Sequence, residues 1–345
     1  MNGDVYTSEV FIDVSWFFIM GRLAYIDRLK GFLMLMVIIG HIPSHTLHPY
    51  YSFSPFLKII MLFHMPAFFF ASGYVAQSRP SKNKCTEKLF RYLCPLIIIG
   101  LLSEYLLYEK SMCHFLSSST WNSYWYLYCI AIFTIMLFPV KFSFNNVKTK
   151  GILIDVLLMV FVISFMVVLY KILSWQVNQI FSIYLLLAYF PFFWLGFIVR
   201  KHKEIEKIID NMWLCVVFFV LSVIFGVLFY ERLNIIYHGL SGVFITFVLL
   251  KLFKLCESRG SVIEKQLALF GRNSLDIYLY QFFLLKLIDV SLVGKWSNSS
   301  HNYIVEFIIM LLMAILISYI CIGIGLLLKK SSLIRKIVYG DVWRV

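Results

Sequence analysis

Charged residues are scarce in this chain, at 14% of 345 residues, whereas soluble domains carry roughly 25%. Hydrophobic residues reach 61%, and the mean hydropathy is +0.84. Glycine (17) and proline (8) are too rare for a collagen-like chain or a Pro/Gly-rich disordered one. Between Leu29 and Leu328 no polar stretch is long enough to form a soluble domain. These shortages exclude a water-soluble globular protein and indicate a single integral membrane domain.

Recognisable metal-binding and soluble catalytic motifs are also missing. The seven cysteines are odd in number and scattered, without a CxxC or CxxH pair, so neither a disulfide framework nor a zinc knuckle is predicted. There is no GxSxG elbow, P-loop, HExxH or DxD pair. His41, His45 and His48 have the spacing of metal ligands on one helical face, but Pro43 interrupts that face. We therefore expect no metal.

Long apolar runs take the place of these motifs. A transmembrane helix needs about 20 mainly apolar residues, and ten segments come close to that length. We predict an all-α integral membrane protein with about ten transmembrane helices and both termini cytoplasmic. The segments are roughly 31–48, 56–77, 92–108, 124–142, 151–170, 179–199, 212–229, 236–253, 273–293 and 304–328.

The basic residues set the predicted orientation, because Lys and Arg favour the cytoplasmic side of short loops. With the N-terminus inside, 25 of the 31 basic residues lie on that side. The net charge of +13 is thus a topology signal and indicates no nucleic-acid partner. Residues 1–21 are predicted to be an interfacial extension or the result of a start site placed too early, 22–328 the membrane domain, and 329–345 a basic cytoplasmic tail. The six basic residues in the outer half are Lys58, Lys110, Lys171, Arg232, Lys286 and Lys295.

Three ionisable residues are predicted at membrane depth, where a titratable group is costly. Counting about 1.5 Å per residue places His41 about 16 Å above Lys30 and brings His64 and Glu104 to a similar level. They suit a buried acid/base cluster in which an imidazole takes a proton from an attacking hydroxyl. The alternative is hydrogen bonding between helices. The other histidines considered are assigned to the outer surface (His45, His48, His114 and His301) or to a solvated basic loop (His202).

A group of cations precedes the third predicted span. Lys88 and Arg91 are one helical turn apart, and Lys30 approaches from the neighbouring helix. Such a group can bind a multiply phosphorylated cofactor. The alternative is that these are the basic residues that ordinarily flank a membrane span on the cytoplasmic side. The remaining cations of this group are Arg79, Lys82 and Lys84.

Several segments together resemble the membrane acyltransferase 3 family, which includes O-acetyltransferases of bacterial surface polysaccharides. Residues 22–31, leading to Gly40-His41, look like the first-helix signature of that family, and 63–74 resemble its second helix. The sequence departs from the family pattern in two places. Lys88 stands where arginine is usual, which loses bidentate phosphate geometry, and Gln281 stands where many members carry histidine. Weaker similarities lie at Trp125-Tyr-Leu, at 192–196 and at 271–279.

The resemblance implies an O-acyltransferase of the bacterial inner membrane, with many spans and membrane lipids around it. Acetyl-CoA would be the co-substrate, held near Lys30, Lys88 and Arg91. His41 would act as base or acyl relay, with Glu104 and His64 as further candidates. The acceptor would be a glycan or lipid-linked glycan, such as O-antigen, capsule or exopolysaccharide. The alternative is a transporter or flippase of lipid-linked sugars with a His/Glu proton relay. The oligomeric state stays open.

Overall fold

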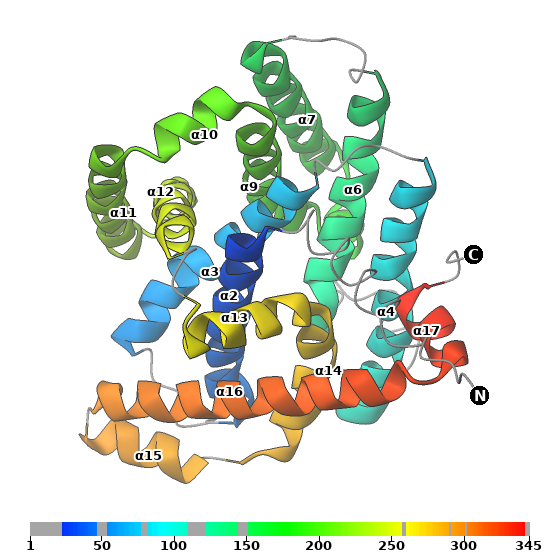
Figure 1. Cartoon of the computed structure of the whole chain (residues 1–345), viewed down its shortest axis with the longest axis vertical. Helices are drawn as coiled ribbons and strands as arrows, with labels where there is room; N and C mark the ends of the chain where they lie inside the picture. Colours follow the sequence, from blue (N-terminus) through cyan, green and yellow to red (C-terminus); the bar gives the residue numbers. More distant parts are fainter. Residues whose placement is uncertain are drawn as a thin grey trace, which may run out of the picture.

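The computed structural model of the protein describes residues 23–46, 54–76, 82–109, 122–143, 151–256, 260–289, 291–300 and 302–341. Within these ranges the chain forms helices and no β-strand, which confirms the all-α prediction (Figure 1). The helices are α2 (Ala24–Thr46), α3 (Pro55–Val75), α4 (Lys82–Tyr108), the 3-10 helix η1 (Asn122–Tyr124), α6 (Trp125–Ser143), α7 (Ile152–Ile172), α8 (Trp175–Ile180), α9 (Ile183–Lys201), α10 (Lys203–Ile209), α11 (Met212–Arg232), α12 (Ile235–Leu255), α13 (Val262–Arg272), α14 (Ser274–Leu287), α15 (Ser291–Ser300), α16 (Tyr303–Leu328) and α17 (Ser332–Tyr339).

Each of the ten predicted spans coincides with a helix. Among the described residues, seven helices are long and apolar enough to cross a membrane: α3, α4, α7, α9, α11, α12 and α16. The other three segments depart from the simple pattern. Helix α2 carries charged residues at its start, the apolar part of α6 is shorter than a full span, and α14 has 14 residues. The count of ten transmembrane helices and the orientation therefore stay predictions.

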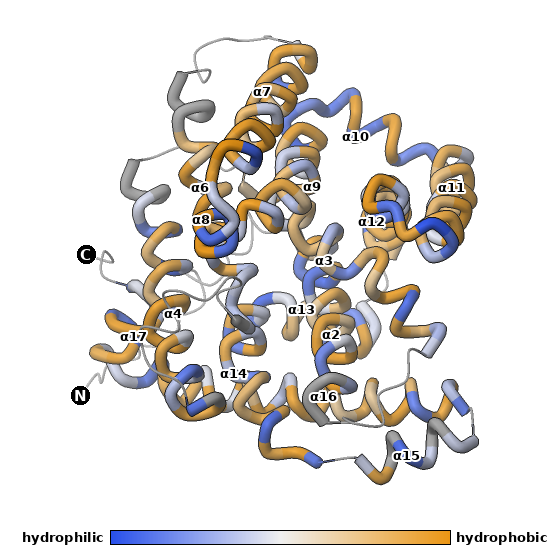
Figure 2. The backbone as a smooth tube through the Cα atoms, turned by 180° about the vertical axis from the view of Figure 1, so that it is seen from behind, coloured by the Kyte–Doolittle hydropathy of each residue, from blue (hydrophilic) through white to orange (hydrophobic). Residues whose placement is uncertain are grey.

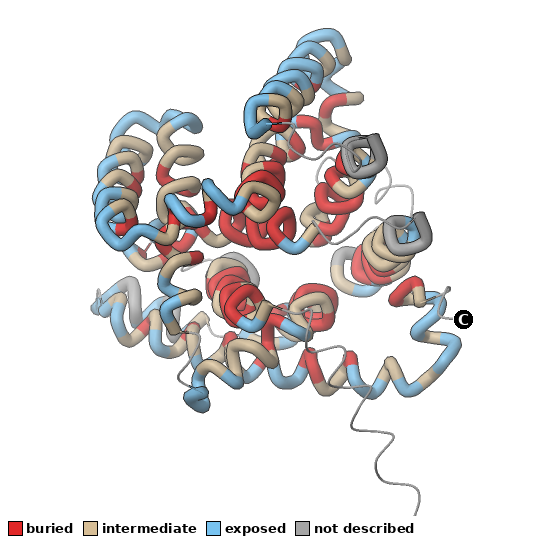
Figure 3. The backbone as a smooth tube through the Cα atoms, turned by 45° about the horizontal axis from the view of Figure 1, so that its top comes forward, coloured by how far each residue is buried: buried red, intermediate tan, exposed pale blue. Residues whose placement is uncertain are grey.

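The burial pattern separates an inner group of helices from an outer one. Helix α2 contacts α3, α12, α13, α14 and α16, and its apolar residues are almost all buried. Helices α7 and α11 instead expose large apolar side chains, among them Phe161 at 68% and Phe219 at 52% (Figures 2 and 3). Apolar surface of this extent is not stable in water. It fits helices whose outer sides face lipid.

Glycines bring two pairs of inner helices into backbone contact. A Cβ atom on Gly31 of α2 would lie 1.9 Å from the carbonyl oxygen of Leu267 in α13, and one on Gly271 would lie 1.8 Å from that of Asp27. Helices α3 and α9 meet in the same way, through Gly73 and Gly196. Only glycine allows this approach, which is typical of helix interfaces in membranes. These contacts fix the rotation of α2 and α3 about their axes.

A buried carboxylate joins α7 to α9. The Asp155 side chain is 2% exposed and accepts hydrogen bonds from Lys201 Nζ at 2.7 and 2.8 Å and from His202 Nε2 at 2.6 Å. His202 is thus held against α7, and the expectation of a solvated basic loop was wrong for this residue. Sequence alone gave no sign of this, because the partner lies 47 positions away.

Helix α10 carries a second buried acid, Glu206. Lys254 Nζ donates to it at 2.7 Å and Lys203 Nζ at 2.8 Å, and the Tyr74 hydroxyl also donates to it. Burial by itself would raise the pKa of the Glu206 carboxyl, but these three hydrogen bonds outweigh it and lower the pKa to about 2. Tyr25 extends the cluster through a hydroxyl contact to Tyr74 at 2.8 Å. The cluster ties α2, α3, α10 and α12 together at one end of the bundle.

We expect Glu206 to make thermal stability depend on pH in the acid range. Its pKa is lower in the folded protein than the ordinary value of 4.5, so its stabilisation is complete above about pH 4.5 and is lost as the pH falls toward 2. The melting temperature of the purified protein, followed between pH 6 and 3, should fall less steeply in Glu206→Gln than in the wild type. Glu204→Gln, exposed on the same helix, is the control. Equal slopes in all three proteins would contradict this role.

The segment predicted as a basic tail folds back onto the bundle. Asp276 of α14 is 1% exposed and accepts hydrogen bonds from Lys329 Nζ at 2.5 Å and from the Tyr339 hydroxyl at 2.8 Å. Gly340 then ends α17 in the left-handed conformation, with φ of 64°, directly against the backbone of Phe90 in α4. Helix α17 therefore lies beside α4, close to the cations that precede the third span (Figure 1).

Candidate functional site

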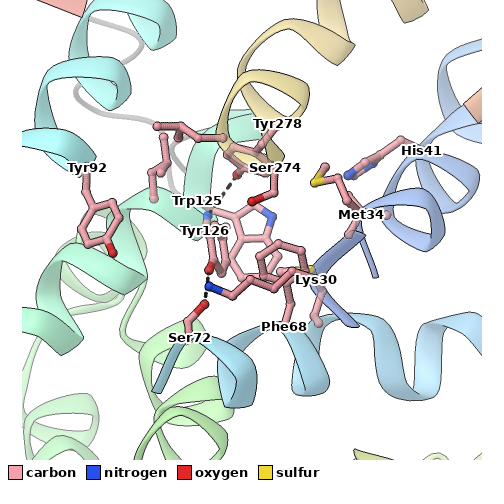
Figure 4. Close-up of a pocket in the computed structure, with 14 residues that line it drawn as sticks. Lys30, Met34, His41, Phe68, Ser72, Tyr92, Trp125, Tyr126, Ser274 and Tyr278 are labelled. Atoms are coloured by element: carbon pink, nitrogen blue, oxygen red, sulfur yellow. Dashed lines mark hydrogen bonds between the residues drawn. The ribbon is translucent and has the colours of Figure 1, made fainter. Parts of the chain in front are cut away.

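A cavity of about 120 Å³ lies where α2, α3, α4, α6 and α14 meet (Figure 4). Its wall is mainly apolar and aromatic, and it includes one histidine and one lysine, both from α2. Few polar groups in an apolar hollow are the usual composition of a site that orients a small ligand. The lining residues are Lys30, Met34, Val37, His41, Met65, Phe68, Ser72, Tyr92, Trp125, Tyr126, Leu127, Ser274, Leu275 and Tyr278.

Helix α2 supplies the two titratable groups because of its periodicity. Lys30, Met34, Val37 and His41 follow one another at spacings of four, three and four residues, which places them along one helical face. His41 is half-buried, and its ring meets Phe282 edge-on, with 5.0 Å between the ring centres. Lys30 extends from the other end of this face toward Ser72 and Tyr126 (Figure 4). Lys30 and His41 therefore line the same cavity, although they were predicted in two different groups.

The start of α6 forms the aromatic wall of this cavity. Tyr124 of η1 is fully buried, and its hydroxyl donates to the carbonyl oxygen of Leu279 in α14 at 2.9 Å. The first N–H groups of a helix have no partner within it. The N–H of Tyr126 donates to the hydroxyl of Tyr278 at 3.3 Å, which in turn donates to the carbonyl oxygen of Ser123 at 2.9 Å. These hydrogen bonds explain why α6 can begin inside the bundle. Backbone N–H and C=O groups outside a regular helix must find hydrogen-bond partners within the protein there.

A second, smaller cavity of about 30 Å³ adjoins the first. Ser72 and Tyr92 line both, and Lys88 lines the smaller one together with Val75 and Ala76 from the end of α3. On the predicted orientation this is the cytoplasmic side. Lys88 and His41 thus belong to neighbouring cavities that meet at two side chains. Sequence reasoning named neither Ser72 nor Tyr92 as a site residue.

Arg91 occupies a different position from Lys88, although only three residues separate them. Its side chain is 41% exposed and forms an ion pair with Asp341, with 3.5 Å between Nη2 and Oδ1. Asp341 directly follows the Gly340 contact that docks the C-terminal segment on α4. Arg91 therefore lies at the surface next to the chain end, and does not line either cavity.

Comparison with known proteins places the chain in a family. The sequence profile of an acyltransferase domain family matches residues 23–323. The chain belongs to the acyltransferase 3 family. Two nodulation proteins named NolL, from Mesorhizobium japonicum and Sinorhizobium fredii, are each 28% identical to it over 137 and 194 residues. The aligned regions cover 35% and 52% of this chain and only 36% and 49% of those relatives. No solved structure matches the chain.

The family match and the apolar helices identify a multi-pass membrane protein of the acyltransferase 3 family. The region matched by the family profile contains all five helices that form the larger cavity, from α2 to α14. The motif segments noticed in the sequence also meet there. Trp125 and Tyr126 come from one weaker similarity, and Ser274 and Tyr278 from another.

Two of the predicted acid/base candidates lie elsewhere. The ring of His64 contacts the carbonyl oxygen of Ile60, one turn earlier on α3, with 2.8 Å between Nδ1 and the oxygen. Glu104 is 1% exposed and buried along α4. Neither lines the cavity of His41 or the one beside Lys88. Gln281, which stands where the family often has histidine, is fully buried in α14 and is likewise absent from both linings.

Other predicted residues lie outside the part of the chain that the structure describes. This holds for residues 1–21, Arg22, His48, Arg79, His114 and His301, and for the side chains of His45, Lys82 and Lys84. Among the described residues, no group of three His, Cys, Asp or Glu side chains could hold a metal ion.

Proposed function

We propose that this protein is a membrane O-acyltransferase of the bacterial inner membrane. It transfers an acetyl group from cytoplasmic acetyl-CoA to a hydroxyl of a cell-envelope glycan, such as O-antigen, capsule or exopolysaccharide. One observation carries the proposal. A histidine able to act as base and a cation able to hold a phosphorylated donor lie in adjoining cavities of an acyltransferase domain. The separation of the two cavities suits a donor and an acceptor that arrive from opposite sides.

His41 is the proposed base. It takes the proton of the acceptor hydroxyl while the hydroxyl oxygen attacks the thioester carbon of the donor. The new ester C–O bond forms, the C–S bond breaks, and the proton passes to the departing CoA thiolate. If His41 instead relays the acyl group, the C–S bond breaks as a C–N bond to the imidazole forms, and this C–N bond then breaks as the ester C–O bond forms, with the hydroxyl proton passing to the imidazole. Both routes place the acyl carbon within reach of the His41 ring.

Lys88 is the proposed donor-side cation, because its ammonium group lies at the small cavity that adjoins the larger one. Acetyl-CoA carries several phosphate groups, which lysine binds as a point charge. Lys30 projects into the larger cavity and lies closer to the acyl end of such a donor than to its phosphates. Arg91, paired with Asp341 at the surface, reaches CoA phosphates outside the cavities.

The transporter alternative requires His41, His64 and Glu104 to form one proton path. Only His41 lines the cavity, and the family match is to an acyltransferase domain. The observations therefore support acyl transfer over sugar transport.

Transfer of label from radiolabelled acetyl-CoA into envelope glycan tests the function directly. Membranes that contain the protein should place label in a base-labile ester, and membranes from cells that lack it should not. Sugar uptake driven by a pH gradient, without any acylation, would instead establish the transporter.

We expect Lys88→Gln to raise the KM for acetyl-CoA about 10- to 100-fold and to change kcat less. The reason is the loss of a charge-assisted contact to phosphate, which is worth about 1.5–3 kcal/mol. Lys88→Arg, which restores the family's residue, should keep the KM low. Lys207→Gln removes an exposed lysine of the same predicted side and serves as control. If both glutamine variants had the wild-type KM, Lys88 would be a topology signal only.

A further inference from the structure

The two cavities meet at a hydrogen bond between helices. The hydroxyl groups of Ser72 in α3 and Tyr126 in α6 lie 2.7 Å apart, and Tyr92 of α4 lines both cavities, as Ser72 does. Ser72 is 9% exposed. Because Ser72 and Tyr92 line both cavities, a donor anchored at Lys88 passes these side chains as its acyl end enters the cavity of His41.

Tyr126 is held firmly in this position. Its ring packs edge-on against Phe68, with 5.2 Å between ring centres, and against Tyr278 at 5.6 Å. Its N–H is bonded to the Tyr278 hydroxyl, as described above. Helix α3 is equally fixed, because the backbone contact of Gly73 with α9 directly follows Ser72. The gap between Ser72 and Tyr126 is therefore set by two anchored helices.

The cavities are also small. Ligand pockets commonly measure about 300–1,000 Å³, whereas these two measure about 120 and 30 Å³. The lining of the larger cavity includes the uncharged side chains of Met34, Val37 and Phe68. The cavity at His41 is therefore small for a ligand site, and a bulky acyl chain would have to displace packed side chains.

We propose that Ser72, Tyr92 and Tyr126 form the constriction of an acyl-thioester passage, which opens when the Ser72–Tyr126 hydrogen bond breaks and which restricts the donor to short acyl groups. Tyr126 and Ser72 are specificity-determining residues in this scheme. The thioester arm takes the place of the hydrogen bond as it enters, and the cavity at His41 receives only the acyl end. This inference rests on the proposed acyl transfer and adds the class of donor.

The experiment compares acetyl-, propionyl-, butyryl- and hexanoyl-CoA as donors for the full-length protein in membranes. The wild type should lose at least about tenfold in kcat/KM between acetyl and butyryl, since a misfit of one or two methylenes is worth at least that much. Tyr126→Phe removes the hydrogen bond and should raise the butyryl-to-acetyl ratio about 2- to 10-fold. A merely structural role of Tyr126 would lower stability and all rates together and leave the ratio unchanged.

Ser72→Leu places a larger side chain in the constriction. We expect acyl transfer to fall at least about 100-fold while CoA itself, titrated onto the purified protein, binds within about twofold of the wild-type affinity. Ser222→Leu is the matched control, because Ser222 lines a separate cavity of about 620 Å³ between α3 and α11 that has room for leucine. The control should transfer acetyl at the wild-type rate.

The outcomes separate the constriction from the function. A wild type that transfers none of the four donors overturns the proposed function and the constriction together. An active wild type with equally active Ser72→Leu, or with an unchanged acyl-length ratio in Tyr126→Phe, overturns the constriction alone. Loss of CoA binding in Ser72→Leu would also overturn it, because the substitution would then have disturbed the donor site instead of the passage.

Discussion

Replacing His41 with glutamine is expected to reduce acyl transfer by about 100- to 10,000-fold. A positioned general base contributes this much, and glutamine keeps the size and polarity of the side chain but cannot take a proton. No other histidine among the described residues lines the cavity, so no neighbour replaces it. The measurement is the initial rate of label transfer from acetyl-CoA into alkali-labile glycan ester, at equal membrane abundance of the two proteins.

The control for His41→Gln is the preceding residue. A Cβ atom on Gly40 would meet nothing within 4 Å, so Gly40→Ala changes the chain beside His41 without a clash. It should transfer acetyl at close to the wild-type rate. Lys88 provides a second comparison, because its loss is expected to raise KM, whereas the loss of His41 is expected to lower kcat. His41→Gln with a wild-type rate would show that the base lies elsewhere.

Replacing Gly271 with alanine is expected to cause the largest loss of stability. The added Cβ atom would lie 1.8 Å from the carbonyl oxygen of Asp27, which is backbone and cannot rotate away. Helices α2 and α13 would have to separate, and overpacking of this kind costs about 1–3 kcal/mol or more. Because Lys30 and Gly31 belong to the same stretch of α2, the cavity would be distorted as well. We expect a lower melting temperature of the purified protein together with weak acyl transfer.

Gly323→Ala is the matched control, since a Cβ atom there meets nothing within 4 Å although the residue also lies in a long apolar helix. It should melt at the wild-type temperature. If Gly271→Ala were equally stable, the close contact between α2 and α13 would not support the position of Lys30 and His41.

The sequence by itself determined that the long apolar segments form helices and which residues share a face of α2. Hydrophobic runs near the length of a bilayer required helices, and each predicted span does coincide with one. The spacing from Lys30 to His41 aligned both on one side of α2, because helical periodicity is a local property. The family resemblance, carried by short motifs of α2 and α3, was confirmed by the match over residues 23–323.

Only the tertiary structure decided which faces of different helices meet. Counting residues gives the depth of a side chain in the membrane, at about 1.5 Å per residue, but not the direction in which its helix is turned. His41, His64 and Glu104 were therefore placed in one layer, while only His41 faces the cavity. For the same reason, Lys88 lines the smaller cavity whereas Arg91 lies at the surface.

The rotation of each helix depends on distant contacts. The backbone contacts of Gly31 and Gly271 set the rotation of α2 about its axis, and those of Gly73 and Gly196 set the rotation of α3. In each contact the two residues are far apart in sequence. These contacts bring Ser72 to Tyr126, although neither was predicted as a site residue from the sequence. The sequence thus specified the helices and their depth, and long-range packing between small residues specified the site.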